Sequence, residues 1–272
     1  MKDFPVSDSG IRFNDLVVRF QTPAGETVTA IDGIQQEIDA HKFISIVGPS
    51  GCGKSTMLNV VAGLQKATEG SVSLGGETMT GPSPQVGLVF QEDSTLPWKT
   101  TTENVAFGMH IRGRLSKSEQ AERTQKMIKL VGLSGFEDVH PVGLSGGMRQ
   151  RVALARTLAQ EPSVLLMDEP FAALDQQTRL LLGAEVRRIW NQTQQTVLFV
   201  THDLSEAILM SQEVWVMSYR PGKILDVIEI DLPAERDATI VGTHQFNELQ
   251  NRVWSTLQRE AMKGFMDESR SA

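Results

Sequence analysis

Apolar stretches of strand length alternate with amphipathic stretches of helix length through much of this chain. Short strand-like runs stand at 43–47, 71–74, 86–90, 164–167 and 197–200. Apolar residues recur at helical spacing within 56–64, 121–131 and 180–190. Since buried strands that alternate with helices are typical of parallel sheets covered on both faces, the pattern predicts an α/β fold with a parallel-rich sheet.

The segment before residue 43 has a different pattern, with strand-like stretches and no helix-like one between them. Two strand-like stretches, 11–20 and 28–34, flank the turn-forming residues 22–26. Strands joined by a short turn pair in the antiparallel sense. The segment therefore predicts an N-terminal antiparallel β flank beside the main sheet.

A helical subdomain is expected between about residues 96 and 160, inserted in a domain that spans 1–230. Ser116 and Glu119 have the spacing of a capping box at the start of one helix. Another helix is expected to follow the Leu-Ser-Gly-Gly sequence at 144–147. Both helices interrupt the alternation of strands and helices, which resumes at 164.

The tail, 231–272, is expected to be a short C-terminal extension. Its apolar residues recur at helical spacing among polar ones, at Phe246, Leu249, Val253 and Leu257. This spacing predicts an amphipathic helix, and packing against its own domain is the expected use of the apolar face.

Composition and charge narrow the class of protein. The chain has 272 residues, 40 % of them apolar, and a formal net charge of −7. The apolar share suffices for a packed core, and the acidic balance argues against nucleic acid as the ligand. No apolar run approaches the roughly 18–20 residues of a membrane-spanning helix, and the first residues lack the apolar core of a secretory signal. We therefore expect a protein of the cytosolic side, without an intrachain disulfide because Cys52 is the only cysteine.

A phosphate-binding loop follows the apolar run at 43–47. Residues 48–55 fit the pattern G-x-x-x-x-G-K-[ST], in which glycines let backbone N–H groups surround a polyphosphate. Lys54 supplies a positive charge there, and the Ser55 hydroxyl is a ligand for Mg²⁺. The residues expected around the phosphates are Gly48, Pro49, Ser50, Gly51, Cys52, Gly53, Lys54, Ser55 and Thr56. This motif alone fits kinases, GTPases, helicases and motor proteins equally well.

Two adjacent acids end the apolar run at 164–167. Asp168 is expected to hold Mg²⁺ through water, and Glu169 to polarise an attacking water. A pair of solvated acids at a strand end is the alternative, which a buried strand before the pair and Pro170 after it disfavour.

A second anion site is expected where a helix begins after Ser145. The Ser145 side chain can cap that helix, and Gly146 and Gly147 leave its first N–H groups bare. If the segment were only a capped helix, two glycines would be a costly way to begin it. Two anion sites with one nucleotide motif suggest a shared ligand.

In their order along the chain, these motifs resemble the ATP-binding subunit of ABC transporters over residues 10–225. The matching segments are Walker A at 48–55, the Q-loop residue Gln91, the signature at 144–148, Walker B at 168–169, the D-loop at 173–175 and the switch residue His202. Met148 departs from the commonest signature, which has Gln. At Met148, and in residues 91–98 and 218–224, the sequence resembles the branch of the family that imports nitrate, sulfonates and taurine.

The resemblance implies a head-to-tail dimer with two ATP molecules, each bound between one subunit's Walker A loop and the partner's signature. Gln91 would contact Mg²⁺ or the attacking water, His202 would contact the γ-phosphate, and Asp175 would link the two sites. Phe20 lies where the family stacks an aromatic ring on adenine. A core position on a β-strand remains the equal alternative for Phe20.

The resemblance also implies integral membrane permease subunits, and indirectly a solute-binding protein, as partners at the cytoplasmic face of the inner membrane. The family docks its permease beside Gln91, in a groove that includes Trp98, although Trp98 can equally be a core residue. The main alternative function is a soluble ABC-type ATPase that acts on nucleic acid or ribosomes, which the acidic charge and the single cassette disfavour. A simple kinase or GTPase would leave Ser145 and His202 unused, and an exporter half-molecule would carry a fused membrane span.

Overall fold

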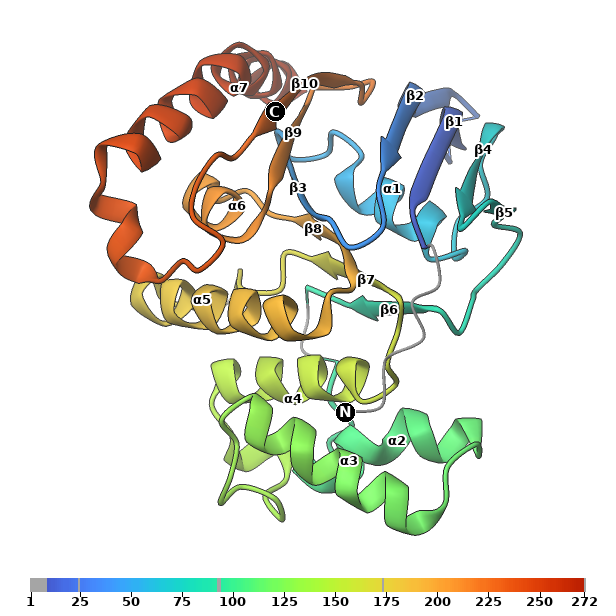
Figure 1. Ribbon diagram of the computed structural model, residues 1–272. Helices are drawn as coiled ribbons and strands as arrows, with labels where there is room; N and C mark the ends of the chain where they lie inside the picture. Colours follow the sequence, from blue (N-terminus) through green and yellow to red (C-terminus); the bar gives the residue numbers. More distant parts are fainter. Residues whose placement is uncertain (1–8, 24, 92–93, 173, 272) are drawn as a thin grey trace.

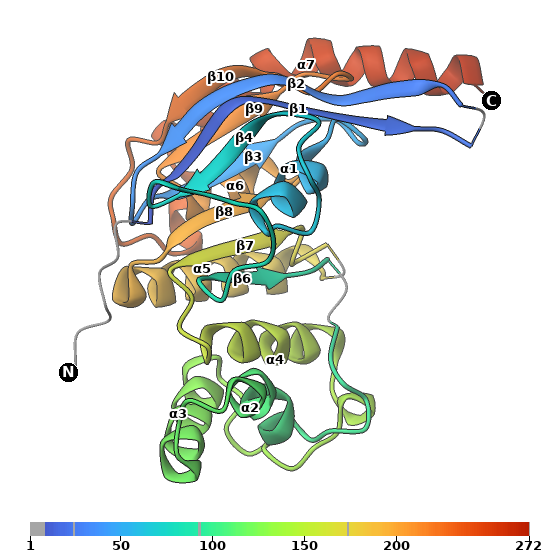
Figure 2. The same ribbon diagram turned by 90° about the vertical axis from the view of Figure 1, so that its right-hand side faces the viewer.

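The chain folds into two sheets, a layer of helices and a helical subdomain (Figure 1). The computed structural model describes residues 9–23, 25–91, 94–172 and 174–271, with side chains up to residue 266. In Figures 1 and 2 the sheets occupy the upper part of the molecule and helices α2, α3 and α4 form the lower part. The expected α/β class with a β flank and a helical insertion is confirmed.

The central sheet has six strands in the order β10-β9-β3-β8-β7-β6. Its strands are β3 (Phe43–Val47), β6 (Val86–Val89), β7 (Val164–Asp168), β8 (Thr196–Val200), β9 (Glu213–Met217) and β10 (Ile224–Glu229). All neighbours pair in parallel except β9 and β10. Every residue of β3 and β8 is buried, which explains why their sequences are apolar without alternation.

The second sheet is antiparallel, with the order β2-β1-β4-β5. It consists of β1 (Ile11–Gln21), β2 (Thr27–Ile38), β4 (Glu69–Leu74) and β5 (Glu77–Thr78). Helix α1 (Lys54–Val61) contacts strands of both sheets, and its Met57 and Leu58 are fully buried in their shared core. The phosphate loop therefore begins at the central sheet and ends at a helix fixed from two sides.

The helical subdomain contains α2 (Thr101–Arg112), α3 (Lys117–Leu130) and α4 (Gly146–Leu158), with a short 3-10 turn at Pro141–Gly143. The predicted capping box of α3 is present, because Ser116 accepts the Glu119 N–H and Glu119 accepts the Ser116 N–H. Helix α2 was not recognised in the sequence as a separate helix. Its buried side includes Thr101 and Asn104, so polar residues interrupt the apolar stripe.

Three helices cover the face of the central sheet opposite α1: α5 (Gln176–Thr193), α6 (Leu204–Met210) and α7 (His244–Ser271), the last after a 3-10 turn at Ala238–Gly242. In α7, Phe246, Val253 and Leu257 are buried and Leu249 packs against the same core. The expected amphipathic helix thus rests on its own domain. Among the helices that the structure describes, not one combines the length and apolar character needed to cross a membrane.

Trp98 is not a core residue. Its side chain lies just before α2 and is 71 % exposed, which removes the core alternative for this tryptophan. Phe20, near the end of β1, is 41 % exposed and pairs with Val28 of β2, so the core alternative for Phe20 is wrong as well.

Candidate nucleotide site

The phosphate loop leads from β3 directly into α1. Gly51 and Gly53 adopt φ values of 71° and 102°, in the left-handed region that favours glycine. A Cβ atom on Gly53 would lie 2.9 Å from the carbonyl oxygen of Ala30, so the β2 backbone also requires glycine there. Because Gly53 is the N-cap of α1 and has no side chain, the first N–H groups of the helix remain available to an anion.

Lys54 lies inside the curve of this loop. Its Nζ donates hydrogen bonds to the carbonyl oxygens of Gly48, at 2.8 Å, and Pro49, at 3.0 Å. The residue is buried, so the ammonium group has little solvent to screen it. The loop thus places a positive charge beside a helix N-terminus. The two together favour the binding of a polyphosphate.

Cys52 faces away from solvent within the same loop. Its side chain is fully buried, and Sγ lies 3.9 Å from Lys54 Nζ. Burial raises the pKa of the Cys52 thiol, and the nearby Lys54 charge only partly opposes that effect. Cys52 is therefore a packed, protonated residue of the loop.

A hydrogen bond joins Ser55, in the first turn of α1, to Asp168 of β7. Ser55 Oγ donates a hydrogen bond of 3.0 Å to Asp168 Oδ1, from the last residue of β7. Burial raises the pKa of Asp168, the Ser55 hydrogen bond lowers it, and the adjacent Glu169 charge raises it further. A cation beside this carboxylate would favour its charged form.

These two groups fit Mg²⁺. A hydroxyl and a carboxylate are oxygen ligands of the kind Mg²⁺ takes, and in nucleotide sites it fills its other positions with water and phosphate oxygens. Within the described ranges no cluster of three or more His, Cys, Asp or Glu side chains is placed to hold a metal ion by itself. The donor set therefore suits a metal that arrives with its nucleotide.

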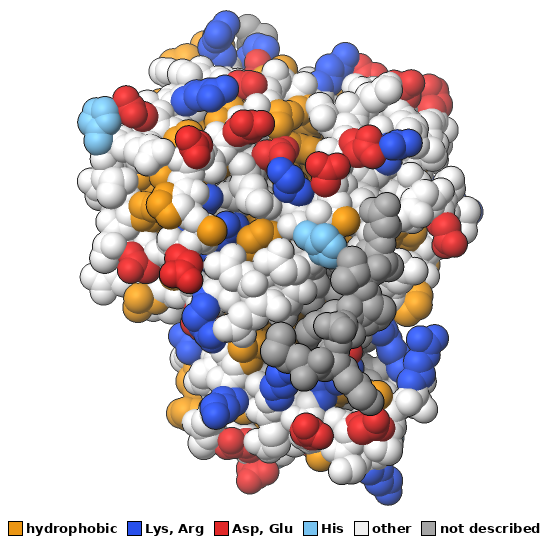
Figure 3. All heavy atoms as spheres, in the orientation of Figure 1, with side chains coloured by type: hydrophobic (Ala, Val, Ile, Leu, Met, Phe, Trp, Pro, Cys, Tyr) orange, Lys and Arg blue, Asp and Glu red, His pale blue; other side chains and the backbone are white. Residues whose placement is uncertain are grey.

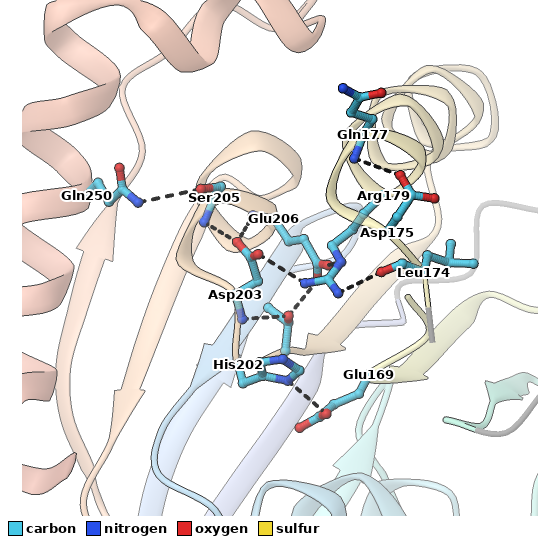
Figure 4. Close-up of polar contacts among 11 residues, drawn as sticks. Glu169, Leu174, Asp175, Gln177, Arg179, His202, Asp203, Ser205, Glu206 and Gln250 are labelled. Atoms are coloured by element: carbon cyan, nitrogen blue, oxygen red, sulfur yellow. Dashed lines mark hydrogen bonds and ion pairs between the residues drawn. The ribbon is translucent and has the colours of Figure 1, made fainter. Parts of the chain in front are cut away.

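Glu169 and His202, for which the sequence predicted separate roles, form a second pair in the structure. They follow the neighbouring parallel strands β7 and β8, and His202 Nδ1 lies 2.9 Å from Glu169 Oε2 (Figure 4). Glu169 has a positive φ of 43° and its N–H donates to the Val200 carbonyl at 2.9 Å. This backbone turn separates the two acids, so Asp168 faces Ser55 while Glu169 faces His202.

A partly buried network behind His202 was not found in the sequence. Arg179 of α5 makes ion pairs of 3.2 Å with Asp203 and with Glu206, and donates to the Leu174 carbonyl at 3.0 Å (Figure 4). Glu206 also accepts a hydrogen bond of 2.5 Å from Thr201. The network joins the segment after Glu169 to the loop that carries His202.

Burial raises the pKa of Glu206 to about 7, and Arg179 opposes the shift only in part. Asp203 caps α6 by accepting the N–H groups of Ser205 and Glu206. The capping spacing of Asp203 and Glu206 was the signal in the sequence for this network. Nothing in the sequence marked Arg179.

Asp175 caps α5. Its carboxylate accepts the N–H groups of Gln177, at 3.1 Å, and Thr178, at 3.0 Å, and the hydrogen bonds to Thr178 lower its pKa. Ala173, the first residue of the expected D-loop, lies outside the described residues. Within one chain Asp175 thus has a structural task, and its expected link to a second site stays a prediction.

The signature segment starts α4 as expected. Ser145 is the N-cap and accepts the Met148 N–H at 3.3 Å, and Gly146 and Gly147 are the first helical residues. Ser145 is exposed, and α4 lies in the lower part of both ribbon views whereas α1 lies in the upper part. One chain therefore does not bring Ser145 to its own phosphate loop.

Gln91 lies two residues beyond the end of β6 and is exposed. The next two residues, Glu92 and Asp93, lie outside the described part of the chain. On the α4 side, Gln150 donates a hydrogen bond of 3.4 Å to the Phe90 carbonyl, which ties the Q-loop strand to the signature helix. The roles of Gln91 at the metal and of Phe20 at adenine remain predictions.

Comparison with known proteins gives one consistent family. The family model described as ABC transporter matches residues 31–172. An uncharacterised ABC transporter ATP-binding protein of Methanocaldococcus jannaschii is 46 % identical, over 88 % of both chains. The aliphatic sulfonates import ATP-binding protein SsuB of Bacillus cereus is 40 % identical over 90 % of this chain and 95 % of its own length. The taurine import ATP-binding protein TauB of Roseobacter denitrificans is 38 % identical over 95 % and 99 %.

Solved structures agree with the sequences. A dimeric ATP-binding cassette in a post-hydrolysis state, bound to ADP and Pi, superposes with a TM-score of 0.72 at 29 % identity, covering 82 % of this chain and all of that chain. A second dimeric structure, of a bacterial ABC transporter cassette, gives a TM-score of 0.73 at 30 % identity with the same coverage. Sequence, fold and the arrangement of loop, acids and histidine converge, and the chain belongs to the ABC transporter family as an ATP-hydrolysing cassette.

Proposed function

We propose that this chain is the ATP-hydrolysing subunit of a membrane importer whose cargo is a small oxyanion, a sulfonate such as taurine. The observation that carries the proposal is the 38–40 % identity to SsuB and TauB, which extends over 90–95 % of the chain. Nitrate, which the same branch of the family imports, is the neighbouring candidate.

ATP binds with its phosphates in the loop that ends at Gly53. The N–H groups at the start of α1 and the Lys54 ammonium hold the β- and γ-phosphates. Mg²⁺ would be held by Ser55, by Asp168 through water, and by Gln91; when bound it supplies positive charge to the phosphate oxygens. Phe20 stacks on the adenine ring with its exposed face.

Glu169 polarises the attacking water and accepts its proton. The 2.9 Å contact with His202 fixes the carboxylate, and His202 contacts the γ-phosphate when ATP is bound. The Arg179 network holds the His202 loop from behind. Catalysis then depends on the orientation of the attacking water and on charged side chains that are already in position before the reaction begins.

A second copy completes each site. Because one chain does not bring Ser145 to its own phosphate loop, two chains arranged head to tail would each place the start of α4 against the partner's γ-phosphate. Asp175 then links the two sites across the dimer. ATP closes the pair and hydrolysis lets it open, which is a shift between two populated arrangements.

The permease binds the helical subdomain, at about 96–160 in a cassette domain that spans 1–230. Phe90, next to Gln91 in the sequence, and Trp98 are both exposed and would supply apolar contacts for it. This places the cassette at the cytoplasmic face of the inner membrane, with the solute-binding protein on the opposite side. Figure 3 shows acidic and basic side chains interspersed on the viewed face, which gives no support to a nucleic-acid partner.

The deciding experiment for the ATPase compares the wild type with Glu169→Gln, and with Glu185→Gln on the outer side of α5 as control. Glu169→Gln should lower turnover by roughly 10²–10⁴-fold, the usual contribution of a general base, while ATP binding persists. In Mg-free ATP this variant should elute as a dimer on size exclusion, and as a monomer without ATP. Rapid turnover by Glu169→Gln would remove Glu169 from the proposed role.

The cargo is tested separately, in proteoliposomes that contain the permease purified with this chain and its binding protein. ATP-dependent uptake of radiolabelled taurine or ethanesulfonate supports a sulfonate importer, and uptake of nitrate alone would redirect the assignment. Turnover stimulated by RNA or ribosomes, with no permease bound, would favour the soluble alternative.

A further inference from the structure

The segment between β9 and β10, residues 218–223, lies between the phosphate loop and α7. We propose that Arg220 in this segment is a positioning residue of the phosphate loop, and that α7 fixes Arg220 through Glu260. The inference rests on the proposed ATP binding at this loop. It gives the C-terminal helix a role in nucleotide affinity.

Arg220 binds the phosphate loop backbone directly. Its Nε donates a hydrogen bond of 2.9 Å to the carbonyl oxygen of Gly51. A Cβ atom on Gly51 would lie 2.4 Å from Arg220 Nη2, so the guanidinium group covers this peptide closely. Because the C=O and N–H of a trans peptide point in opposite directions, holding the Gly51 oxygen also fixes the Cys52 N–H. That N–H already points back across the loop, toward the Pro49 carbonyl at 3.3 Å.

A second contact fixes the same segment against the next loop residue. A Cβ atom on Gly222 would lie only 2.1 Å from the carbonyl oxygen of Cys52, so the two backbones pack without room for a side chain. Gly222 also donates to the Ala30 carbonyl at 2.9 Å. The segment therefore follows two successive peptides of the phosphate loop.

Helix α7 holds the other side of the segment. The buried Glu260 accepts the Tyr219 N–H at 2.9 Å, and Lys263 donates to its other carboxylate oxygen at 2.5 Å. A Cβ atom on Gly264 would lie 3.2 Å from the Tyr219 ring and 3.7 Å from Pro49 Cβ, so α7 approaches both the segment and the phosphate loop. Contacts run from Glu260 to Tyr219, and from the adjacent Arg220 to Gly51.

The geometry explains why a loop of glycines keeps one shape. Gly51 has a positive φ, and a chain of this freedom loses much entropy when a phosphate fixes it. A guanidinium hydrogen bond to its carbonyl restricts the loop before the nucleotide arrives, and preorganisation of this kind raises affinity. Arg220 thus acts on binding through the loop and needs no contact with the reacting atoms.

The test measures ATP affinity by titration calorimetry on the full chain, alongside KM and kcat for hydrolysis. Arg220→Met should weaken ATP binding by roughly tenfold, the scale of one hydrogen bond from a charged donor, and raise KM with kcat nearly unchanged. Arg220→Lys should restore part of the affinity because it keeps a charged donor. Arg188→Met, which removes an exposed arginine paired with Glu185, is the matched control and should bind ATP as the wild type does.

Glu260→Gln tests the contribution of α7, with Glu248→Gln, exposed near the start of the same helix, as control. Glu260→Gln should weaken ATP binding by about threefold in the wild type. It should add nothing in Arg220→Met, because Glu260 acts on the loop only through Arg220 and the effects of coupled residues do not add. An Arg220→Met protein that melts at the wild-type temperature and binds ATP equally well would overturn the inference. A full Glu260→Gln effect in the Arg220→Met background would overturn the part played by α7.

The proposed function and this inference fail in different ways. If the wild type itself binds no ATP, the proposed function fails and the variants are not the cause. If the wild type binds ATP and Arg220 can be replaced without loss of affinity, only the inference fails. Should Arg220→Met not fold, Arg220→Lys against Arg188→Lys gives the same comparison, with a smaller expected change in Kd.

Discussion

Helices of this chain begin in two opposite ways. In the helical subdomain, α2 and α3 start with capping boxes whose carboxylates, Glu103 and Glu119, bind the helix's own N-terminus. The first turns of α1 and α4 contain no acid: they read Lys-Ser-Thr-Met from Lys54 and Gly-Gly-Met-Arg from Gly146. A helix that supplies its own carboxylate satisfies its N–H groups and its dipole internally. A helix without one can leave both open to an external anion, and this is the role that we propose for the starts of α1 and α4.

The sharpest way to break this comparison is to give α4 the capping box of α3. Met148→Glu places a carboxylate three residues after Ser145, where it would occupy the anion site and repel the γ-phosphate. We expect steady-state turnover to fall on the order of 10³-fold, since mispaired charge at such a site costs at least as much as a lost donor.

Met148→Gln is the matched control, because it has the same shape without the charge, and it should keep turnover near the wild-type value. ATP binding by the monomer should be unchanged in both variants, as measured by calorimetry. Equal turnover by Met148→Glu and Met148→Gln would mean that the start of α4 binds no phosphate.

Helix α6 sharpens the comparison because its first-turn acid is buried. Burial raises the pKa of Glu206 from 4.5 to about 7, so this residue contributes stability that is fully present below pH 4.5 and is lost as the pH rises through 7. Given roughly 1.4 kcal/mol per pKa unit, the loss between pH 5 and 8 should be about 2–3 kcal/mol.

Urea unfolding at pH 5 and pH 8 measures this loss. Glu206→Gln should flatten the dependence of the unfolding free energy on pH, because the amide stays neutral throughout. Glu185→Gln, at an exposed ion pair, should leave the slope as in the wild type. A wild-type slope in Glu206→Gln would show that another group titrates in this range.

The smallest effect is expected where a capping box serves only the fold. Ser116→Ala removes the cap of α3 and should lower the unfolding free energy by about 1 kcal/mol. ATP affinity and turnover should not change, because this helix end binds its own Glu119. Ser118→Ala, two residues along in the exposed first turn, is the control for the loss of a hydroxyl. Reduced turnover in Ser116→Ala alone would contradict the separation of the two kinds of helix.

The sequence was sufficient wherever function depends on local spacing. The phosphate loop, the acids at the end of β7 and the cap at Ser145 were all predicted, because each is a short pattern beside a strand or a helix. The strands β3 and β8 were predicted because both are buried throughout.

What the sequence did not reveal depends on distant contacts. Arg220 and Gly51 are 169 residues apart, and Arg179 reaches three partners on two different segments. An arginine on an amphipathic helix or in a turn looks the same whether it faces solvent or a buried carboxylate. Only the packing of α5 and of the β9–β10 segment assigns these two residues their partners.

Cys52 has a practical consequence for following this molecule in motion. Maleimides and similar probes react with thiolates, and this thiol is enclosed and kept protonated by its surroundings. A dye or spin label should therefore couple selectively to a cysteine introduced at an exposed site such as Ser118, leaving the native one unmodified. Distances between two labelled copies can then be recorded through the ATP cycle in the natural sequence background.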